Sequence, residues 1–483
     1  MNASIDVRAE ATDKISRSTR FYYGFGSVAY GVKDNGFVYF LLFYYNQVLG
    51  LPGHLASTAI LVALVFDAIS DPIVGNISDR LHSKWGRRHP FMYAAAFPVA
   101  FSFYGLWNPP ELSEDGLFYF LMFNALLVRT FITFYEVPST ALAPELTPNY
   151  DERTKLAATR HFFGWVGGIT IAVVMYGFLM VKTPEFGEGA LNPAAYQTYG
   201  LLGAAMIFIA IMTSAVGTHR HIPDLMQPPP KRKASLKLSL LEAKETLANR
   251  SFYAVFGFGL FAAMAGGLSG SLSIYFGTYF WGFTPGQLGV LVPTGLISAT
   301  FALSFAPYVS HRYGKKRGAI GLSLFATSFA PAPYLARLAG LTPASGSTEL
   351  LMLLIVYNVI EIGLIISSTT LVSAMIADVV EESELVTGRR SEGIFFAARS
   401  FISKSVSGLG IMLGTLLLSA VEFPQDAKPG EVDPQIVENL GYGYVPMIIV
   451  LYLSAIACLV AYNITRERHL KNVEVLAARR SAS

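Results

Sequence analysis

The most regular feature of the chain is a succession of apolar stretches, each about as long as a membrane-spanning helix. Crossing the hydrocarbon core of a bilayer takes roughly 20 mostly apolar residues. Gly and Pro interrupt several stretches, which helices embedded in lipid tolerate. The pattern predicts an all-α polytopic membrane protein with twelve transmembrane helices, near residues 21–48, 54–78, 90–108, 117–143, 156–181, 198–217, 252–281, 286–309, 318–340, 349–376, 393–420 and 442–464.

The composition strengthens this prediction. Hydrophobic residues make up 53% of the 483 positions and charged residues 14%, against about 25% charged residues in a typical soluble protein. So few charges exclude a soluble or a disordered chain, and we expect membrane lipids around the helices. The net charge of +3 argues against nucleic acid as a partner. The single Cys excludes an internal disulfide, and no protein partner is evident.

The positive charges predict an orientation. Of the 36 Lys and Arg residues, 28 fall in the two terminal tails and in every second loop, whereas the alternate loops hold three. Because Lys and Arg collect on the cytoplasmic side, both termini are expected to be cytoplasmic, in a plasma membrane. The cytoplasmic segment 218–250 is then a linker between an N-terminal six-helix bundle, 1–217, and a C-terminal six-helix bundle with a cytoplasmic tail, 251–483.

A basic loop follows the second predicted span of each half. It reads Gly-Arg-Arg at 86–88 and Gly-Lys-Lys-Arg at 314–317. Six plus six spans with a shared loop indicate an internal repeat, which is typical of secondary transporters. The alternative is that both loops are ordinary cytoplasmic anchors.

Two acids lie one helical turn apart in the second predicted span. Asp67 follows eight apolar residues, and Asp71 precedes Pro72. Positions i and i+4 share a helix face, so the carboxylates repel each other unless a cation or a proton lies between them. Pro72 also displaces the helical hydrogen bond to the carbonyl of Ala68, and hard cations favour such oxygen sets. We interpret the pair as a cation site; the alternative is a solvated helix end.

Other predicted spans also carry ionisable residues, and each is costly in hydrocarbon unless it faces a partner or a cavity. We interpret them as lining a water-filled pathway, although each alone could be a structural ion pair. Arg129 also lies deep in a span, but the sequence assigns it no role. The residues interpreted as lining the pathway are Lys33, Asp34, Glu136, Arg160, His161, Glu361, Arg399 and Lys404.

A run of acids closes the tenth predicted span. Asp378 and Glu381 lie there, shortly before Arg389. We expect them at the cytoplasmic end, forming a gate with basic loops such as the one that holds Arg87 and Arg88. A solvated run of charges is an equal alternative.

Motifs for catalysis are missing from the sequence. It holds no P-loop, no Gly-x-Ser-x-Gly elbow and no His-Glu-x-x-His, the patterns that mark nucleotide hydrolysis, acyl transfer and zinc catalysis. The prediction is a protein that is not an enzyme and that uses no cofactor beyond a coupling ion.

Several motifs together resemble the major facilitator superfamily and, within it, the glycoside–pentoside–hexuronide:cation symporters, typified by melibiose permease. The resemblance covers nearly the whole chain and implies two six-helix bundles that work by alternating access. The motifs are Asp-Ala-Ile-Ser-Asp-Pro-Ile-Val-Gly at 67–75 with Trp-Gly-Arg-Arg at 85–88, Tyr-Gly-Phe-Gly at 23–26 with Lys-Asp at 33–34, and the segments 377–393 and 401–404.

The resemblance also implies roles for single residues. Asp67 and Asp71 would bind the coupling cation, Na⁺, H⁺ or Li⁺, with Lys404 near it, and family habit favours Na⁺. Lys33 and Asp34 would bond sugar hydroxyls.

Three further positions concern the substrate. Arg160 matches an arginine of the sugar pocket, Glu136 takes the place of an Asp, and Thr140 stands where the sugar transporter has a stacking Trp. The expected substrate is a sugar or glycoside. One alternative is a lysophospholipid, as in the Na⁺-dependent lysophospholipid transporters of the same family, and another is a membrane receptor that moves no solute.

Overall fold

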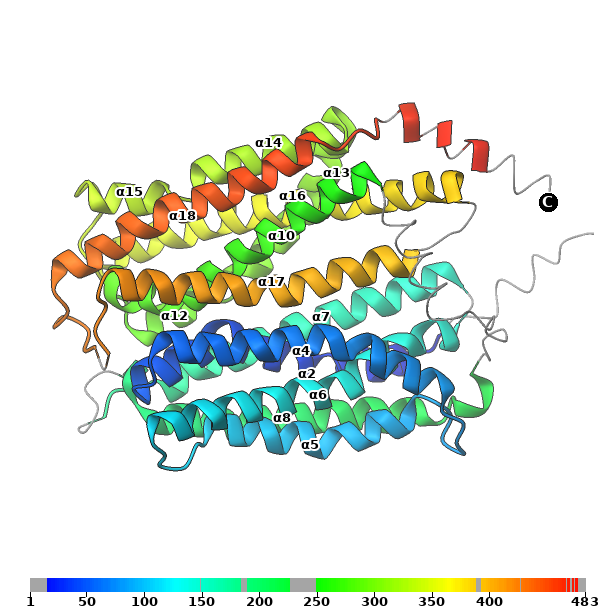
Figure 1. The fold of residues 1–483 in the computed structure, drawn as a ribbon, viewed down its shortest axis with the longest axis horizontal. Helices are drawn as coiled ribbons and strands as arrows, with labels where there is room; N and C mark the ends of the chain where they lie inside the picture. The colour runs from blue at the N-terminus through cyan, green and yellow to red at the C-terminus, as the bar shows by residue number, and fades with distance from the viewer. Residues whose placement is uncertain are drawn as a thin grey trace, which may run out of the picture. The chain divides into compact units, whose positions relative to one another are not determined.

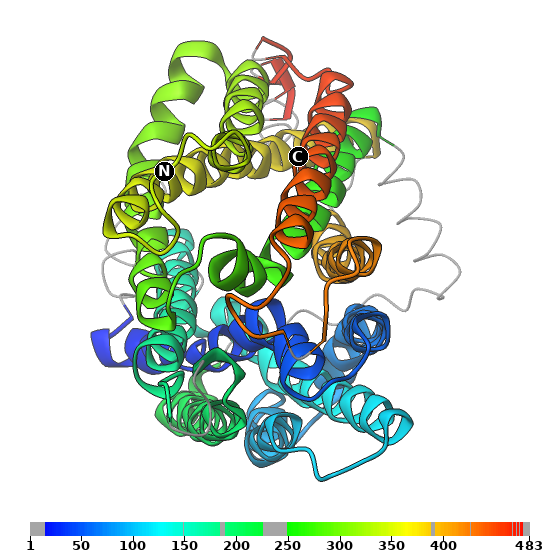
Figure 2. The ribbon, with the colours of Figure 1, turned by 90° about the vertical axis from the view of Figure 1, so that its left-hand side faces the viewer.

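The chain consists of helices joined by short loops. The computed structural model describes residues 15–147, 149–183, 189–225, 249–387, 392–425, 427–465, 467–469, 471–472 and 474–476, and none of these residues forms a strand. The chain divides into two compact units, Met1–Arg232 and Lys233–Ser483. Figures 1 and 2 show that the long helices of each unit lie side by side.

The described part of the N-terminal unit contains five long helices besides a segmented first span. The span predicted near 21–48 is divided among α1 to η2, of which η1 and η2 are π-helical turns, so it is helical but not one regular α-helix. The elements are α1 (Arg17–Phe25), α2 (Val28–Asn35), η1 (Gly36–Phe40), α3 (Leu41–Phe43), η2 (Tyr44–Val48), α4 (Gly53–Arg80), α5 (His89–Trp107), α6 (Glu114–Leu146), α7 (Tyr150–Val174), η3 (Met175–Leu179), η4 (Gly189–Leu191), α8 (Pro193–His219) and η5 (Ile222–Asp224).

The C-terminal unit is built in the same way. Its α16 continues to Thr387, so the acids predicted to follow the tenth span lie inside a helix. The elements are α10 (Arg250–Ser271), α11 (Ser273–Tyr275), η6 (Phe276–Phe280), α12 (Pro285–Leu291), α13 (Thr294–Tyr313), α14 (Lys315–Phe329), α15 (Ala332–Leu338), α16 (Thr348–Thr387), α17 (Glu392–Ala420) and α18 (Pro434–Val460).

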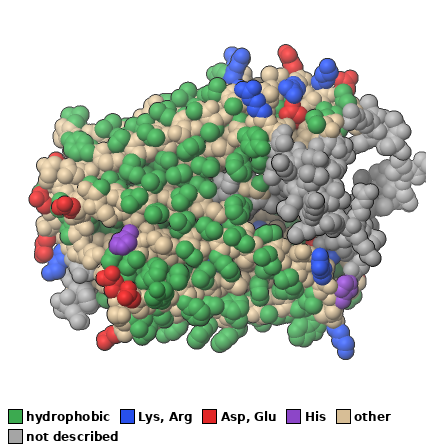
Figure 3. Space-filling view, viewed as in Figure 1, with side chains coloured by type: hydrophobic (Ala, Val, Ile, Leu, Met, Phe, Trp, Pro, Cys, Tyr) green, Lys and Arg blue, Asp and Glu red, His purple; other side chains and the backbone are tan. Residues whose placement is uncertain are grey.

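Nine helices in the described part of the chain are long and apolar enough to cross a membrane. The other predicted spans coincide with the segmented α1–η2, with α5 and with α17, of which Lys404–Ala420 is the described apolar part. In Figure 3, hydrophobic side chains cover most of the visible face and charged side chains collect toward the helix ends. Phe97, Phe101 and Phe178 are each more than 60% exposed, which suits contact with lipid tails.

The two units repeat the same backbone features at matching places. In each, the first predicted span ends in a π-helical turn followed by a glycine with positive φ, 73° at Gly50 and 68° at Gly282. The paired basic loops also contain such a glycine, with φ 68° at Gly86 and 79° at Gly314. Only glycine adopts this region at no steric cost, so both loops use a glycine where the backbone takes a positive φ.

Close helix crossings are part of this repeat. In the N-terminal unit α2 lies so near α7 that a Cβ atom at Gly31 would be 1.9 Å from the carbonyl oxygen of Gly164. In the C-terminal unit a Cβ atom at Gly267 of α10 would be 2.1 Å from the carbonyl oxygen of Ser407 in α17. Small residues permit such approaches between membrane helices. The first crossing also fixes the part of α2 that carries Lys33 and Asp34.

Adding one methyl group at Gly267 tests the crossing between α10 and α17. Gly267→Ala is expected to destabilise the fold by about 1–3 kcal/mol, because two packed helices must move apart. The neighbouring Gly266 has no atom within 4 Å of its Cβ position, so Gly266→Ala serves as the matched control. Thermal unfolding of the purified variants measures both. An equal melting temperature for the two variants would contradict the crossing.

Candidate cation and substrate site

The acid pair of α4 lies in the interior of the N-terminal unit. The side chain of Asp67 is 0% exposed, which rules out the interpretation of Asp67 as a solvated helix end. Asp71 is half-buried one turn further along, and Pro72 lies inside the helix. A fully buried carboxylate needs compensating charge or hydrogen bonds, and those come from the adjacent helix α6.

Thr133 of α6 joins the two acids. Its Oγ1 lies 2.8 Å from Oδ1 of Asp67 and 3.1 Å from Oδ1 of Asp71. A hydroxyl has only one proton to donate, so it cannot satisfy both carboxylates at the same time. Three oxygen atoms from two helices therefore meet at one buried point, where a proton or a small cation would complete the set. The sequence reasoning missed Thr133, because a threonine in an apolar run carries no signal of its own.

Arg129 lies one turn before Thr133 on the same helix. Its Nη1 is 3.3 Å from Oδ2 of Asp67 and its side chain is almost fully buried. The structure thus places a permanent positive charge at the predicted cation site. In the sequence, the spacing of four residues between Arg129 and Thr133 could have indicated this arrangement, since it puts both side chains on one helix face.

The acid–base pair of α2 is open on one side only. Nζ of Lys33 lies 2.7 Å from Oδ1 of Asp34, and the exposed fractions of the two side chains are 2% and 52%. Lys33 is therefore held in the interior, whereas Asp34 presents carboxylate surface outward. Such a surface can accept hydrogen bonds from the hydroxyl groups of a solute.

Arg160 of α7 contacts α6 and α1. Its Nη1 donates to Oγ of Ser139 over 3.0 Å and its Nη2 to Oγ1 of Thr140 over 2.9 Å. The guanidinium carbon lies 5.4 Å from the ring centroid of Tyr23, a cation–π contact. The structure therefore brings Arg160 and Thr140 together, as the predicted pocket requires. Glu136 is half-buried one turn before Thr140 and accepts the Thr140 hydroxyl at its backbone carbonyl, at 2.7 Å.

Two predicted basic residues lie in the C-terminal unit. Lys404 is half-buried in α17, and its carbonyl accepts the Ser407 hydroxyl at 2.8 Å. Its predicted position near Asp67 and Asp71 stays a prediction. Arg399 belongs to the same helix, but its side chain lies outside the described residues.

The basic loop of the N-terminal unit forms ion pairs with the ends of α4 and α6. Arg88 is buried, with its Nη2 2.6 Å from Oδ1 of Asp79 and its Nε 2.8 Å from Oε1 of Glu145. Nη2 of Arg87 lies 2.7 Å from the same Glu145 oxygen. The two arginines thus tie α4 to α6 within the N-terminal unit, and the predicted gate role of Arg87 and Arg88 stays a prediction.

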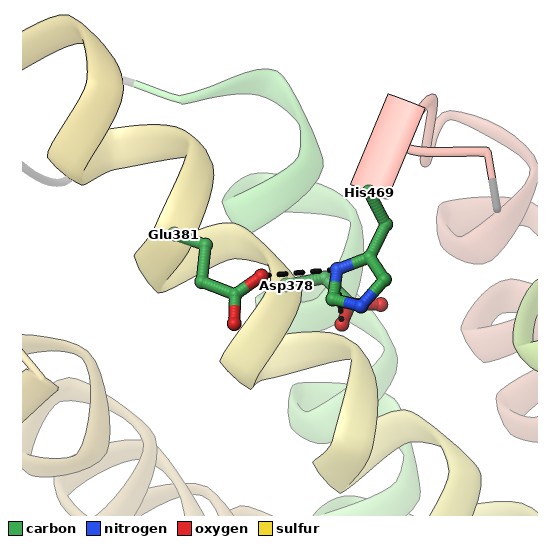
Figure 4. A group of neighbouring side chains, drawn as sticks. All are labelled: Asp378, Glu381 and His469. Atoms are coloured by element: carbon green, nitrogen blue, oxygen red, sulfur yellow. Dashed lines mark ion pairs between the residues drawn. The ribbon is translucent and has the colours of Figure 1, made fainter. Parts of the chain in front are cut away.

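The matching basic segment of the C-terminal unit forms an ion pair with α16. Nζ of Lys315 lies 2.5 Å from Oδ1 of Asp378, and the hydroxyl of Tyr462 donates to Oδ2 over 3.3 Å. Burial, together with the nearby Asp378, raises the pKa of Tyr462, which keeps its proton available. Figure 4 shows Nδ1 of His469 between Asp378 and Glu381, at 3.3 and 3.0 Å.

This cluster bears on two questions. Asp378, Glu381 and His469 offer metal-type ligand atoms within 4.8 Å of one another, but the Lys315 ammonium already occupies one side of Asp378. We therefore interpret the cluster as an ion-pair network that joins α14, α16 and the C-terminal segment. Arg389, the remaining predicted gate residue, lies outside the described residues.

A conservative substitution tests the ion pairs that Arg87 and Arg88 form with Glu145. Glu145→Gln removes the charge shared by Arg87 and Arg88 and is expected to destabilise the fold by about 1.5–3 kcal/mol, the value of hydrogen bonds to charged groups. Glu114→Gln, at the exposed start of the same helix, is the matched control. The comparison is made by thermal unfolding at low and high salt. Equal unfolding temperatures for the two variants would show that these ion pairs do not stabilise the fold.

Long apolar helices in two repeated units, with buried charges facing one another, define a polytopic secondary transporter. The comparison with known families agrees. Residues 22–466 match the family described as MFS/sugar transport protein, and the chain therefore belongs to this family of the major facilitator superfamily. Its members are membrane transporters rather than enzymes, so the chain is a multi-pass membrane protein that carries small molecules.

Individual relatives cover nearly the whole chain. A "putative glycoside/cation symporter" of Escherichia coli K12 is 23% identical, over 94% of each chain. The "sodium-dependent lysophosphatidylcholine symporter 1" of Gallus gallus is 25% identical, over 99% of this chain and 92% of the relative. Among solved structures, a D-xylose–proton symporter aligns with a TM-score of 0.59 at 14% identity, over 91% of this chain and 96% of the other. This last likeness concerns the fold.

Proposed function

We propose that the chain is a cation-coupled symporter that carries a sugar or glycoside across the plasma membrane. The coupling ion is Na⁺ by preference, with H⁺ as the alternative. One observation carries the proposal: the fully buried Asp67 and its neighbour Asp71 both approach the hydroxyl of Thr133. Two carboxylates that share one donor in the membrane interior are stabilised when a positive charge enters between them.

The geometry suits a small hard cation. Carboxylate and hydroxyl oxygens are the ligands that such ions prefer, and Pro72 leaves the Ala68 carbonyl without its helical partner. A proton on either acid would remove the same repulsion. In the proposed cycle, a bound cation also frees Lys404 from pairing with the acids, so that solute and cation favour the same state. Each then raises the affinity for the other by an equal factor.

The polar groups around the cation site suit a hydroxyl-rich solute. The half-exposed Asp34 accepts hydrogen bonds, and the Arg160 guanidinium, one nitrogen of which bonds Thr140, has further N–H donors. Glu136 lies on α6, one turn before Thr140. The name of the Escherichia coli relative, a glycoside/cation symporter, supports this substrate class. Transport then follows from rocking of two six-helix bundles about the site, with both termini in the cytoplasm.

A second candidate function, lysophospholipid transport, is favoured by one observation in the C-terminal unit. A cavity of about 220 Å³ lies between α10 and α16. Its lining is mainly apolar and includes Phe252, Phe256 and Val372. Apolar side chains of this kind suit an acyl chain, and the Gallus gallus relative is named for a lysolipid.

Loss of one carboxylate tests the ion site. Asp71→Asn is expected to abolish Na⁺-stimulated uptake in proteoliposomes, because one neutral and one charged side chain no longer need a cation between them. Asp115→Asn, on the exposed first turn of α6, controls for the substitution itself. Na⁺ stimulation that persists in Asp71→Asn would rule the mechanism out.

A ligand panel separates the two substrate classes. Glycosides and lysophosphatidylcholine are compared for their effect on the unfolding temperature of the purified chain. A true substrate at 100 times its Kd stabilises the fold by about 2.7 kcal/mol. We expect a glycoside to give this shift and Arg160→Gln to remove it. A shift with lysophosphatidylcholine alone would support lysophospholipid transport and contradict sugar or glycoside transport.

A further inference from the structure

The buried Arg129 is a charge to which the proposed mechanism gives no task. It lies on α6, within the membrane-spanning part of the N-terminal unit, and only 3% of its surface is exposed. Its guanidinium carbon rests 4.3 Å from the ring centroid of Phe37. A guanidinium stays protonated in proteins, so the predicted cation site contains a permanent positive charge before any ion arrives.

One nitrogen of Arg129 faces two acids. Nη1 lies 3.3 Å from Oδ2 of Asp67 and 3.9 Å from Oδ1 of Asp34. The first acid belongs to the candidate ion site and the second to the candidate solute site. Arg129 is therefore within reach of both sites, and it is 0.6 Å closer to the ion site (3.3 against 3.9 Å).

The distances indicate that Arg129 contacts both Asp67 and Asp34 and that neither acid holds it tightly. Tight charge-assisted bonds measure about 2.7–2.9 Å, and Arg88 of the same unit makes contacts of 2.6 and 2.8 Å with its two acids. Both Arg129 contacts are longer. In addition, Nε of Arg129 is buried and has no hydrogen-bond partner among the described residues. A side chain with long contacts and an unused donor can change partners at small cost.

We propose that Arg129 is a tethered cation that competes with the coupling ion for Asp67 and signals the ion's arrival to Asp34. This inference rests on the proposed cation symport and adds a specificity-determining residue to it. An ion bound between Asp67 and Asp71 repels the guanidinium, which turns toward Asp34. When the ion leaves, the guanidinium returns to Asp67.

The move has a consequence in the solute site. Oδ1 of Asp34, the oxygen nearest to Arg129, is also the oxygen paired with Lys33 at 2.7 Å. A guanidinium that approaches this oxygen competes with the Lys33 ammonium for it. Lys33 or the Asp34 carboxylate is thereby released toward a solute. The ion site and the solute site are linked through one side chain inside a single unit.

Cation binding to the purified full-length chain tests the proposal without a transported solute. The unfolding temperature is followed as Na⁺ or Li⁺ replaces choline at constant ionic strength, at two pH values. In Arg129→Gln the half-saturating Na⁺ concentration should fall about tenfold or more, because one charged hydrogen bond no longer opposes the ion. Arg129→Lys keeps the charge and should stay close to wild type.

A double-mutant cycle tests the exchange between the two acids. Asp34→Asn takes away the alternative partner of Arg129, so Na⁺ binding should weaken severalfold in an otherwise unchanged chain. In the Arg129→Gln background the same change should have no effect. Lys155→Gln, which removes an exposed cation from α7, should alter neither result.

The outcomes separate this inference from the proposed function. An unchanged Na⁺ affinity in Arg129→Gln overturns the tethered cation while cation symport stands. Cation binding that appears only in Arg129→Gln supports the competition and overturns cation coupling in the natural chain. If neither protein is stabilised by Na⁺, by Li⁺ or by a lower pH, both proposals fail.

Discussion

The structure of the N-terminal unit depends on how the charge of Asp67 is compensated. A carboxylate with no exposed surface, on a helix that crosses the membrane, is stable only beside donors and positive charge. α6 supplies both, the Thr133 hydroxyl at 2.8 Å and the Arg129 guanidinium at 3.3 Å. This requirement fixes which faces of α4 and α6 meet, and it makes their contact sensitive to any ion that binds there.

α6 organises the polar chemistry of the whole unit. Arg129 and Thr133 face α4, and one to two turns further along Ser139 and Thr140 receive the hydrogen bonds of Arg160 from α7. The contacts of the acid pair and those of Arg160 therefore lie on one continuous helix. At its end, Glu145 forms ion pairs with Arg87 and Arg88 of the basic loop.

The sequence predicted those features that one segment determines by itself. Apolar length predicted most of the spans, and the spacing of Asp67 and Asp71 predicted a shared face. It could not predict that Thr133 bridges these acids or that Arg129 pairs with Asp67, because both contacts join segments about 60 residues apart. Likewise, the π-helical turns that divide the first span could not be predicted from hydropathy, which does not distinguish π-helical from α-helical turns. The role given to Lys404 remains a prediction from resemblance, and that of Arg389 a prediction from the pattern of charges.

The central claim is that the buried acid pair holds a monovalent cation. Equilibrium binding of radioactive Na⁺ to the purified chain, compared with Asp67→Asn, tests it most directly. The account predicts one saturable site in the unmodified chain, weakened by protons and lost in the variant. Equal saturable binding in both proteins, or none in the unmodified chain at any pH, would contradict it.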